Sequence, residues 1–198
     1  MYKVTVLFSG GVDSSVLLAW FKKQEIECQP LFIDYGQVTG SMELSSAKKI
    51  SEKMGFELEK ITIPNVSSLT KNQITDPANS QNPFFPNRNL LLLSLGSLHA
   101  YENKNQGVGI GAIGADGSTP FPDISQIFFD EFSKVVRTSL NYELAILTPF
   151  LELTKTEVVK IGRNLHVPFE ITYSCLTKND VPCEICESCI SRKKALGE

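Results

Sequence analysis

The chain has 198 residues, of which 42% are hydrophobic, so it can bury a core of its own, and we expect one domain or one domain with an appendage. Its formal net charge is −3, from 19 basic and 22 acidic side chains, and no run of like charge stands out. This balance argues against a nucleic-acid-binding platform, which usually carries a basic stripe. No apolar stretch of about 18 residues is present, so no membrane span is expected.

The start of the chain and its cysteines indicate the compartment. The N-terminal residues lead directly into an apolar run at 4–8, without a separate targeting segment. Five cysteines in such a chain are typical of thiols or metal ligands rather than of disulfides. We therefore expect a cytoplasmic protein.

Strand and helix patterns alternate along the chain. Strands are predicted at 4–8, 30–34, 57–63, 107–111 and 143–147, and helices at 14–24, 41–54, 88–102, 123–139 and 154–165. This alternation predicts an α/β fold with a mostly parallel sheet and helices on both faces. Such a sheet binds its ligand beyond the carboxyl ends of its strands.

Two stretches depart from this alternation. Residues 64–87 are rich in Asn, Ser, Thr and Pro, and we interpret them as a flap near the site, because long loops in compact domains are usually functional or mobile. After residue 165 the chain becomes cysteine-rich. We therefore divide it into a domain at 1–165 and a metal-binding segment at 166–198 packed on that domain.

The stretch Ser9–Ser15, between the first strand and the first helix, is the first candidate site. Gly10 and Gly11 allow a tight turn and a close approach of the backbone to a ligand. The N–H groups of this turn and of the following helix start can bind an anion, and a nucleotide phosphate is the leading candidate. Asp13 supplies a carboxylate for magnesium. The alternative is an ordinary turn with Ser14 as N-cap.

Arg88 is the second candidate. It follows Pro86 and lies in the first turn of an apolar helix, where the helix dipole disfavours a cation. A neighbouring anion would explain its position, and an exposed arginine is the alternative. His99, inside the same helix, is interpreted as a core histidine with satisfied hydrogen bonds.

Lys155 is the third candidate. Thr154 and Glu157 have the spacing of a capping box, which explains both as a helix start. Lys155 between them is not explained by capping and can offer a point charge to a phosphate. A purely structural role is the alternative.

Four cysteines near the C-terminus form the strongest single motif. Cys175 and the closely spaced Cys183, Cys186 and Cys189 can close a tetrahedral thiolate site. Four sulfur ligands leave no open position for water, so the metal would be structural. Zinc is favoured, and an iron–sulfur cluster is the rival. Cys28 is interpreted as a buried apolar thiol.

The sequence SGGVDSS resembles the SGGxDS loop of the PP-loop ATPases. Members of that superfamily split ATP between the α and β phosphates and adenylate a carboxylate or a carbonyl-like oxygen. The resemblance implies that the pyrophosphate end of ATP is held by Ser9, Gly10, Gly11, Asp13, Ser14 and Ser15. Asp34 and Lys155 complete the expected nucleotide site, and Asp13, Arg88 and Lys155 are the expected catalytic residues.

The chain as a whole resembles the QueC-like enzymes, or 7-cyano-7-deazaguanine synthases. The resemblance is carried by residues 9–15, 32–37, 84–89, 148–149, 153–157, 174–175, 182–189 and 191–195. In that family ATP activates the carboxylate of 7-carboxy-7-deazaguanine, ammonia displaces AMP, and a second ATP-driven step gives the nitrile. The resemblance implies a Rossmann-like PP-loop ATPase fold, use of ATP, Mg²⁺ and Zn²⁺, and a homodimer.

The family's base-binding segment resembles residues 114–123. A carboxylate is the natural partner of the guanine N1–H and 2-amino edge, because both are donors. Asp116 and Asp123 are the candidates, with Phe85 and Phe121 as stacking faces. Asp123 is alternatively the N-cap of the next helix.

The sequence departs from the family pattern at two places. Val38-Thr39 stand where the family has Arg-His, and Ile124-Ser125 where it has Cys-Arg. These changes concern the nitrogen acceptor, which is either ammonia or, as in divergent antiphage-defence members, a protein amino group. Another PP-loop activity such as tRNA thiolation, and a metal-stabilised binding module, are the remaining alternatives.

Overall fold

The computed structural model describes residues 2–70, 72, 74–75, 84–114, 121–177 and 180–198. Within these residues the strands form one parallel sheet in the order β3-β2-β1-β4-β5. The strands are β1 (Lys3–Leu7), β2 (Glu27–Asp34), β3 (Glu59–Thr62), β4 (Gly107–Gly109) and β5 (Ala145–Leu147). The helices are α1 (Val12–Lys23), α2 (Gly40–Met54), α3 (Arg88–Glu102), α4 (Gln126–Leu140), α5 (Lys155–Asn164) and α6 (Glu187–Leu196). The predicted α/β fold is confirmed.

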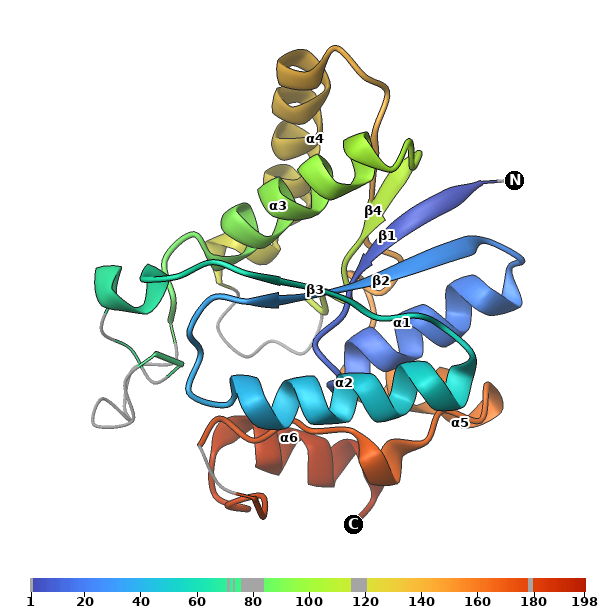
Figure 1. Cartoon of the computed structure of the whole chain (residues 1–198). Helices are drawn as coiled ribbons and strands as arrows, with labels where there is room; N and C mark the ends of the chain where they lie inside the picture. Colours follow the sequence, from blue (N-terminus) through green and yellow to red (C-terminus); the bar gives the residue numbers. More distant parts are fainter. Residues whose placement is uncertain (1, 71, 73, 76–83, 115–120, 178–179) are drawn as a thin grey trace.

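The helices cover both faces of the sheet. Figure 1 shows α3 and α4 on one face and α1, α2, α5 and α6 on the other. Each layer has its own apolar core, one containing Leu93 and Phe132 and the other containing Leu17 and Ile50. The central strand β1 is buried on both sides over Val4–Leu7, which explains why these residues are apolar apart from Thr5.

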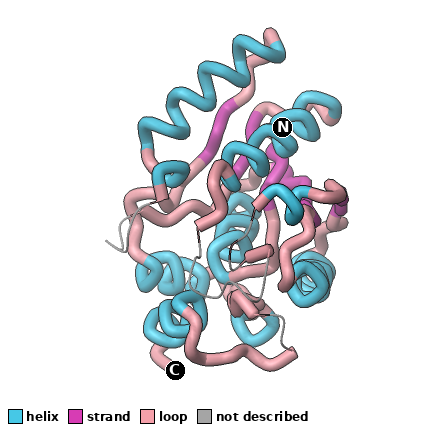
Figure 2. Tube along the Cα trace, turned by 90° about the vertical axis from the view of Figure 1, so that its left-hand side faces the viewer, coloured by secondary structure: helices cyan, strands magenta, loops and turns pink. Residues whose placement is uncertain are grey.

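The strand order reverses between β1 and β4. The chain passes outward through β2 and β3 and then returns to add β4 and β5 on the other side of β1. A crevice forms at such a switch point, outside the carboxyl ends of the strands. This end of the sheet lies at the left of Figure 1 and faces the viewer in Figure 2, where connecting loops gather.

Several element boundaries differ from the predicted ones. Helix α1 begins at Val12, two residues before the predicted start, with Gly11 as its N-cap. The alternative interpretation of Ser14 as N-cap is wrong, because Ser14 lies inside the helix and its hydroxyl donates to the Gly11 carbonyl (3.3 Å). Helix α4 begins at Gln126, and its cap is the hydroxyl of Ser125. Helix α3 has its predicted bounds.

Residues after α5 return to Ser9–Ser15, the predicted phosphate-binding loop (the phosphate loop). The Tyr173 N–H donates to the Gly10 carbonyl (3.1 Å). Helix α6 packs through Ala195 and Leu196 on Val12 and Val159 of the neighbouring helices. The C-terminal segment therefore contacts the loop of the first strand–helix unit directly.

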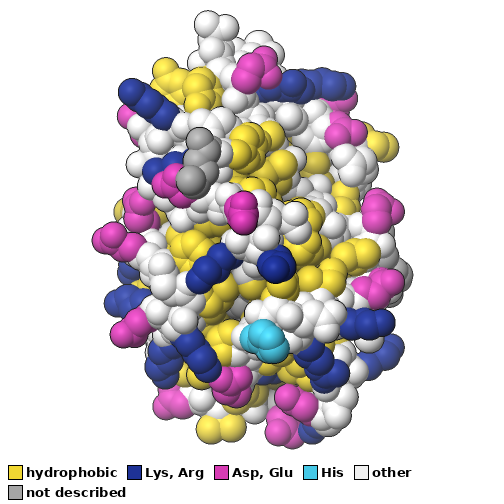
Figure 3. All heavy atoms as spheres, turned by 90° about the vertical axis from the view of Figure 1, so that its right-hand side faces the viewer, with side chains coloured by type: hydrophobic (Ala, Val, Ile, Leu, Met, Phe, Trp, Pro, Cys, Tyr) yellow, Lys and Arg dark blue, Asp and Glu magenta, His cyan; other side chains and the backbone are white. Residues whose placement is uncertain are grey.

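Two surface features bear on partners. Among the described residues, no helix is long and apolar enough to cross a membrane. The face at the amino ends of the strands carries acidic and basic side chains interspersed with apolar ones, rather than one sign of charge (Figure 3).

Candidate active site

The phosphate loop is pressed closely against helix α2. Gly10 has φ +76°, and a Cβ added there would lie 2.5 Å from the backbone nitrogen of Ala47 and 2.9 Å from the carbonyl oxygen of Glu43. The Ser46 hydroxyl donates to the Gly10 carbonyl (3.0 Å). Only glycine suits this position, because a side chain would meet backbone on the other side. The N–H groups at the start of α1 lack partners within the helix, as at any helix start, and suit an anion.

Asp13 and Lys155 form an ion pair at this loop although 142 residues separate them in sequence. The Lys155 ammonium donates to both carboxylate oxygens of Asp13, at 2.6 and 2.5 Å. Lys155 is the first residue of α5, which begins with the predicted capping box of Thr154 and Glu157. The Thr154 backbone and side chain donate to Glu157 and lower the pKa of its carboxyl. The capping box thus fixes the start of the helix that carries Lys155.

A cavity of about 660 Å³ opens beside this pair. Its polar lining includes Ser9, Gly11, Asp13, Ser14, Gln37, Glu43, Arg88, Asn89, Lys155, Ser174, Glu187, Ser188 and Ser191, and its apolar lining includes Ile74, Phe84, Leu92, Phe121 and Ile124. A volume of this size is typical of sites for nucleotides and other small molecules. Ile74 and Phe84 come from the predicted flap, which therefore contributes to the cavity wall.

Arg88 lines the cavity together with Glu43, a partly buried acid, and it also lies near Tyr35. Burial raises the pKa of Tyr35 to about 12, and the Arg88 guanidinium acts in the opposite direction. Burial also raises the pKa of Glu43, against hydrogen bonds from Thr39 and Gln37 and the charge of Arg88. Arg88 is thus a cation at the helix start with an anion near it, as its position in the sequence predicted.

One of the two phenylalanines expected to line the cavity does not line it. Phe121 lines the cavity and stacks on Phe84, with ring centroids 5.5 Å apart. Phe85 is buried and packs edge-on against Tyr35. Of the two adjacent phenylalanines, the cavity therefore receives Phe84 rather than the expected Phe85.

The aspartates expected at the ligand have other partners where the structure describes them. Asp123 accepts the backbone N–H of Asn89 (2.9 Å) and so caps the start of α3 rather than of α4. Asp34 pairs with Lys60 (2.9 Å). Neither is among the cavity-lining residues. Asp116 lies outside the described residues.

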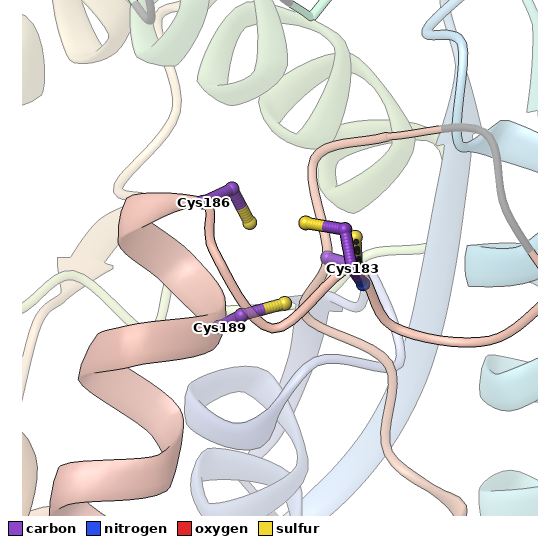
Figure 4. Close-up of side chains that lie close together, drawn as sticks. Cys183, Cys186 and Cys189 are labelled. Atoms are coloured by element: carbon purple, nitrogen blue, oxygen red, sulfur yellow. Dashed lines mark hydrogen bonds between the residues drawn. The ribbon is translucent and has the colours of Figure 1, made fainter.

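The four cysteines of the C-terminal segment lie together. The sulfurs of Cys175, Cys183, Cys186 and Cys189 all lie within 4.8 Å of one another. Figure 4 shows Cys183, Cys186 and Cys189 pointing toward a common centre at the start of α6. The spacing fits a single metal ion, since two thiolates on one zinc ion each lie about 2.3 Å from it.

The surroundings of Cys175 favour a thiolate. Burial raises the pKa of its thiol, but hydrogen bonds from the side chain and N–H of Thr177 and from the N–H of Cys183 lower it to a net value of about 6. The two N–H donors lie 3.4 Å from the sulfur. Hydrogen bonds to the ligand atoms are typical of metal-binding sites. Cys175 also lines the cavity, so the cysteine segment forms part of its wall.

Two further side chains have the predicted structural roles. His99 is nearly buried, and its ring nitrogens bond to the Thr5 hydroxyl (2.9 Å) and the Glu59 carboxylate (3.1 Å). Cys28 is buried, and burial followed by the charge of Glu27 raises its pKa to about 12. Neither side chain lines the cavity.

The family model for "Queuosine biosynthesis protein QueC" matches residues 3–198. The chain belongs to the QueC family. This QueC-family chain is 32% identical to 7-cyano-7-deazaguanine synthase 1 of Desulfitobacterium hafniense, over 98% of the chain and 91% of the relative. It is 35% identical to the 7-cyano-7-deazaguanine synthase of Leptospira interrogans serovar Lai, over 99% of the chain and 87% of that relative.

Solved structures show the fold of this QueC-family chain at lower identity. A predicted subunit of tRNA methyltransferase from Methanocaldococcus jannaschii has a TM-score of 0.59 and 21% identity, over 83% of this chain and 76% of the other. The U34-tRNA thiolase NcsA from Methanococcus maripaludis, with its [4Fe-4S] cluster, has a TM-score of 0.56 and 18% identity, over 98% of this chain and 64% of the other. The predicted family, the PP-loop ATPase fold and the assignment as an enzyme are confirmed.

Proposed function

We propose that this chain is an ATP-dependent ligase that adenylates the carboxylate of 7-carboxy-7-deazaguanine and transfers the acyl group to nitrogen. The curated relatives are named for the synthesis of 7-cyano-7-deazaguanine, which supports a 7-deazaguanine as the substrate. The observation that carries the proposal is the arrangement at the loop, where Asp13, Lys155 and the N–H groups of α1 face one cavity with Arg88. This arrangement provides both an anion site and cations to neutralise phosphate charge.

The chemistry needs positioning rather than a protein nucleophile. A carboxylate resists attack because its charge repels nucleophiles and oxide is a poor leaving group, and adenylation removes both obstacles. In the proposed reaction the loop N–H groups hold the departing pyrophosphate, while Lys155 and Arg88 stabilise negative charge as it develops. The apolar wall around Phe84 and Phe121 excludes water from the acyl adenylate.

Asp13 and the cysteines are suited to two different metal ions. Asp13 offers the hard carboxylate oxygens that Mg²⁺ prefers, and magnesium bound there, in exchange for the Lys155 ammonium, would neutralise phosphate charge. The four sulfurs suit zinc, because they converge as closely as one tetrahedral ion requires. An iron–sulfur cluster that binds each thiolate through a different iron would need a wider spacing.

The nitrogen acceptor has two candidates. Ammonia would give 7-cyano-7-deazaguanine after a second activation. A protein amino group is the alternative, and the reaction would then stop at the amide because a secondary amide cannot become a nitrile. Ile124 supports the alternative, since it lines the cavity where the family has cysteine. Another PP-loop activity, adenylation of a tRNA as in tRNA thiolation, is the remaining alternative, and the tRNA enzymes among the solved structures support only the fold.

The test is product analysis. The zinc-loaded protein is incubated with ATP, magnesium, 7-carboxy-7-deazaguanine and either ammonia or candidate partner proteins, and nucleotides and products are identified by mass spectrometry. We expect AMP release in the wild type and its loss in Asp13→Ala. Release of ADP alone, or an unaltered acid with every amine offered, contradicts the ligase. A free nitrile and a protein adduct distinguish the two acceptors.

A further inference from the structure

Glu43 is a cavity residue that neither the sequence motifs nor the proposed mechanism uses. It lies in the first turns of α2, where its backbone carbonyl faces Gly10 of the phosphate loop. Its side chain is partly buried and lines the cavity near Tyr35 and Arg88. The carboxylate is therefore placed close to both the loop and the aromatic part of the cavity.

The carboxylate of Glu43 is held in one orientation. The Thr39 hydroxyl donates to its Oε1 (2.5 Å), and the Gln37 side-chain amide donates to its Oε2 (3.1 Å). Gln37 is itself fixed, because its amide oxygen accepts the Tyr35 N–H (3.0 Å) and its amide nitrogen also donates to the Ile33 carbonyl (3.3 Å). Each carboxylate oxygen retains a further lone pair for a ligand.

The charge of Glu43 limits what it can bind. Among the described residues, no lysine, arginine or histidine nitrogen lies within 4.0 Å of its oxygens. A carboxylate beside a loop that holds phosphates repels those phosphates, and it suits the part of a ligand that presents hydrogen-bond donors. The other described carboxylates of the cavity are engaged or remote, since Asp13 pairs with Lys155 and Glu187 opens α6 beside the cysteines.

We propose that Glu43, positioned by Gln37 and Thr39, accepts the ring N–H and the exocyclic amino group of a guanine-type base. Two adjacent donors match two fixed carboxylate oxygens, whereas the adenine edge offers an amino group next to an acceptor. Glu43 then selects bases that carry a 2-amino group. The inference depends on the proposed function, because it concerns the acid that this reaction activates.

Glu157 in the same chain is the matched control that tests whether Glu43 has a purely structural role. Glu157 also begins a helix and also bonds to a threonine, Thr154, but it does not line the cavity. Replacement of either glutamate by glutamine keeps one acceptor oxygen and puts an amide donor in place of the other oxygen. Only Glu43→Gln places an amide N–H donor against one of the two N–H donors of the guanine-type base.

The experiment measures selectivity for the 2-amino group. Binding of 7-carboxy-7-deazaguanine and of its analogue without the 2-amino group is measured by calorimetry, and kcat/KM for AMP release is measured with each. The wild type and Glu157→Gln should prefer the amino compound by about 10- to 100-fold, the range for a hydrogen bond to a charged group. Glu43→Gln should lose most of this preference while its KM for ATP stays unchanged.

The outcomes separate the inference from the proposed function. If Glu43→Gln keeps the wild-type preference, or raises the KM for ATP instead, Glu43 does not recognise the base. A wild type that neither binds nor converts the acid overturns the proposed function and the inference with it. If Glu43→Gln unfolds, Gln37→Met replaces it, since loss of the positioning amide should also reduce the preference. An unchanged preference in a folded Gln37→Met would again contradict the inference.

Discussion

Gly10 gives the sharpest test of how the phosphate loop meets helix α2. Gly10 and Gly55, the C-cap of α2, have the same φ of +76°. A Cβ added at Gly55 meets nothing within 4 Å, whereas one at Gly10 would lie 2.5 Å from the backbone nitrogen of Ala47. Substitution by alanine therefore costs the left-handed backbone strain at both positions, but a steric clash only at Gly10.

The size of each effect follows from these contacts. The left-handed conformation of a residue with a Cβ costs about 1–2 kcal/mol. The clash at Gly10 involves backbone atoms that cannot rotate away, so α2 or the loop must move, and such overpacking costs about 1–3 kcal/mol more. We expect Gly55→Ala to destabilise the fold by about 1–2 kcal/mol and Gly10→Ala by about 2–5 kcal/mol.

The assay compares both variants with the wild type as zinc-loaded proteins. Free energies of unfolding are measured by urea titration. Thermal melting is a second readout, since for a chain of this size a loss of 1 kcal/mol lowers Tm by about 2–4 °C. ATP affinity is measured in parallel, and only Gly10→Ala should lose it, because its loop amides are displaced. If Gly10→Ala is no less stable than Gly55→Ala and binds ATP normally, the loop does not pack against α2 as described.

Three further predictions concern other parts of the molecule. Cys186→Ser should lose stoichiometric zinc and soluble yield together, as metal binding contributes folding energy, whereas Cys28→Ser should keep both; a folded, metal-free Cys186→Ser contradicts this. Lys155→Met should raise the KM for ATP at least about 10-fold with an unchanged far-UV spectrum, and a wild-type KM would exclude a phosphate contact. Thr5→Val should lower stability by about 1–3 kcal/mol in urea titration, because it removes the partner of the His99 Nδ1 and one partner of the buried Asn105 amide, while kcat for AMP release stays unchanged.

Features set by local sequence were predictable. The bounds of α3 followed from Pro86 before Arg88 and from the apolar pattern after it, and the start of α5 followed from its capping box. The start of α1 was misplaced because its cap, Gly11, offers no side chain to recognise. The convergence of the four cysteines was also foreseeable from their spacing.

Features set by contacts distant in sequence were not predictable. The choice between Phe84 and Phe85 depends on which way an extended segment faces, since successive side chains point in opposite directions. The role of Asp123 depends on its lying beside Asn89 in the first turn of α3, 34 residues earlier in the chain. Glu43 was missed because in sequence it is only one more acid in the first turns of a helix.

The closing contact between Tyr173 and Gly10 has a consequence for synthesis of the protein. The walls of the cavity come from segments as far apart as Ser9 and Ser191. A nascent chain of which only the sheet and helices α1 to α5 have left the ribosome carries the phosphate loop. It lacks the C-terminal residues that form one wall of the cavity. The cavity is therefore complete only after the C-terminal segment, which carries Tyr173 and Ser191, has been synthesised and has folded back onto the loop.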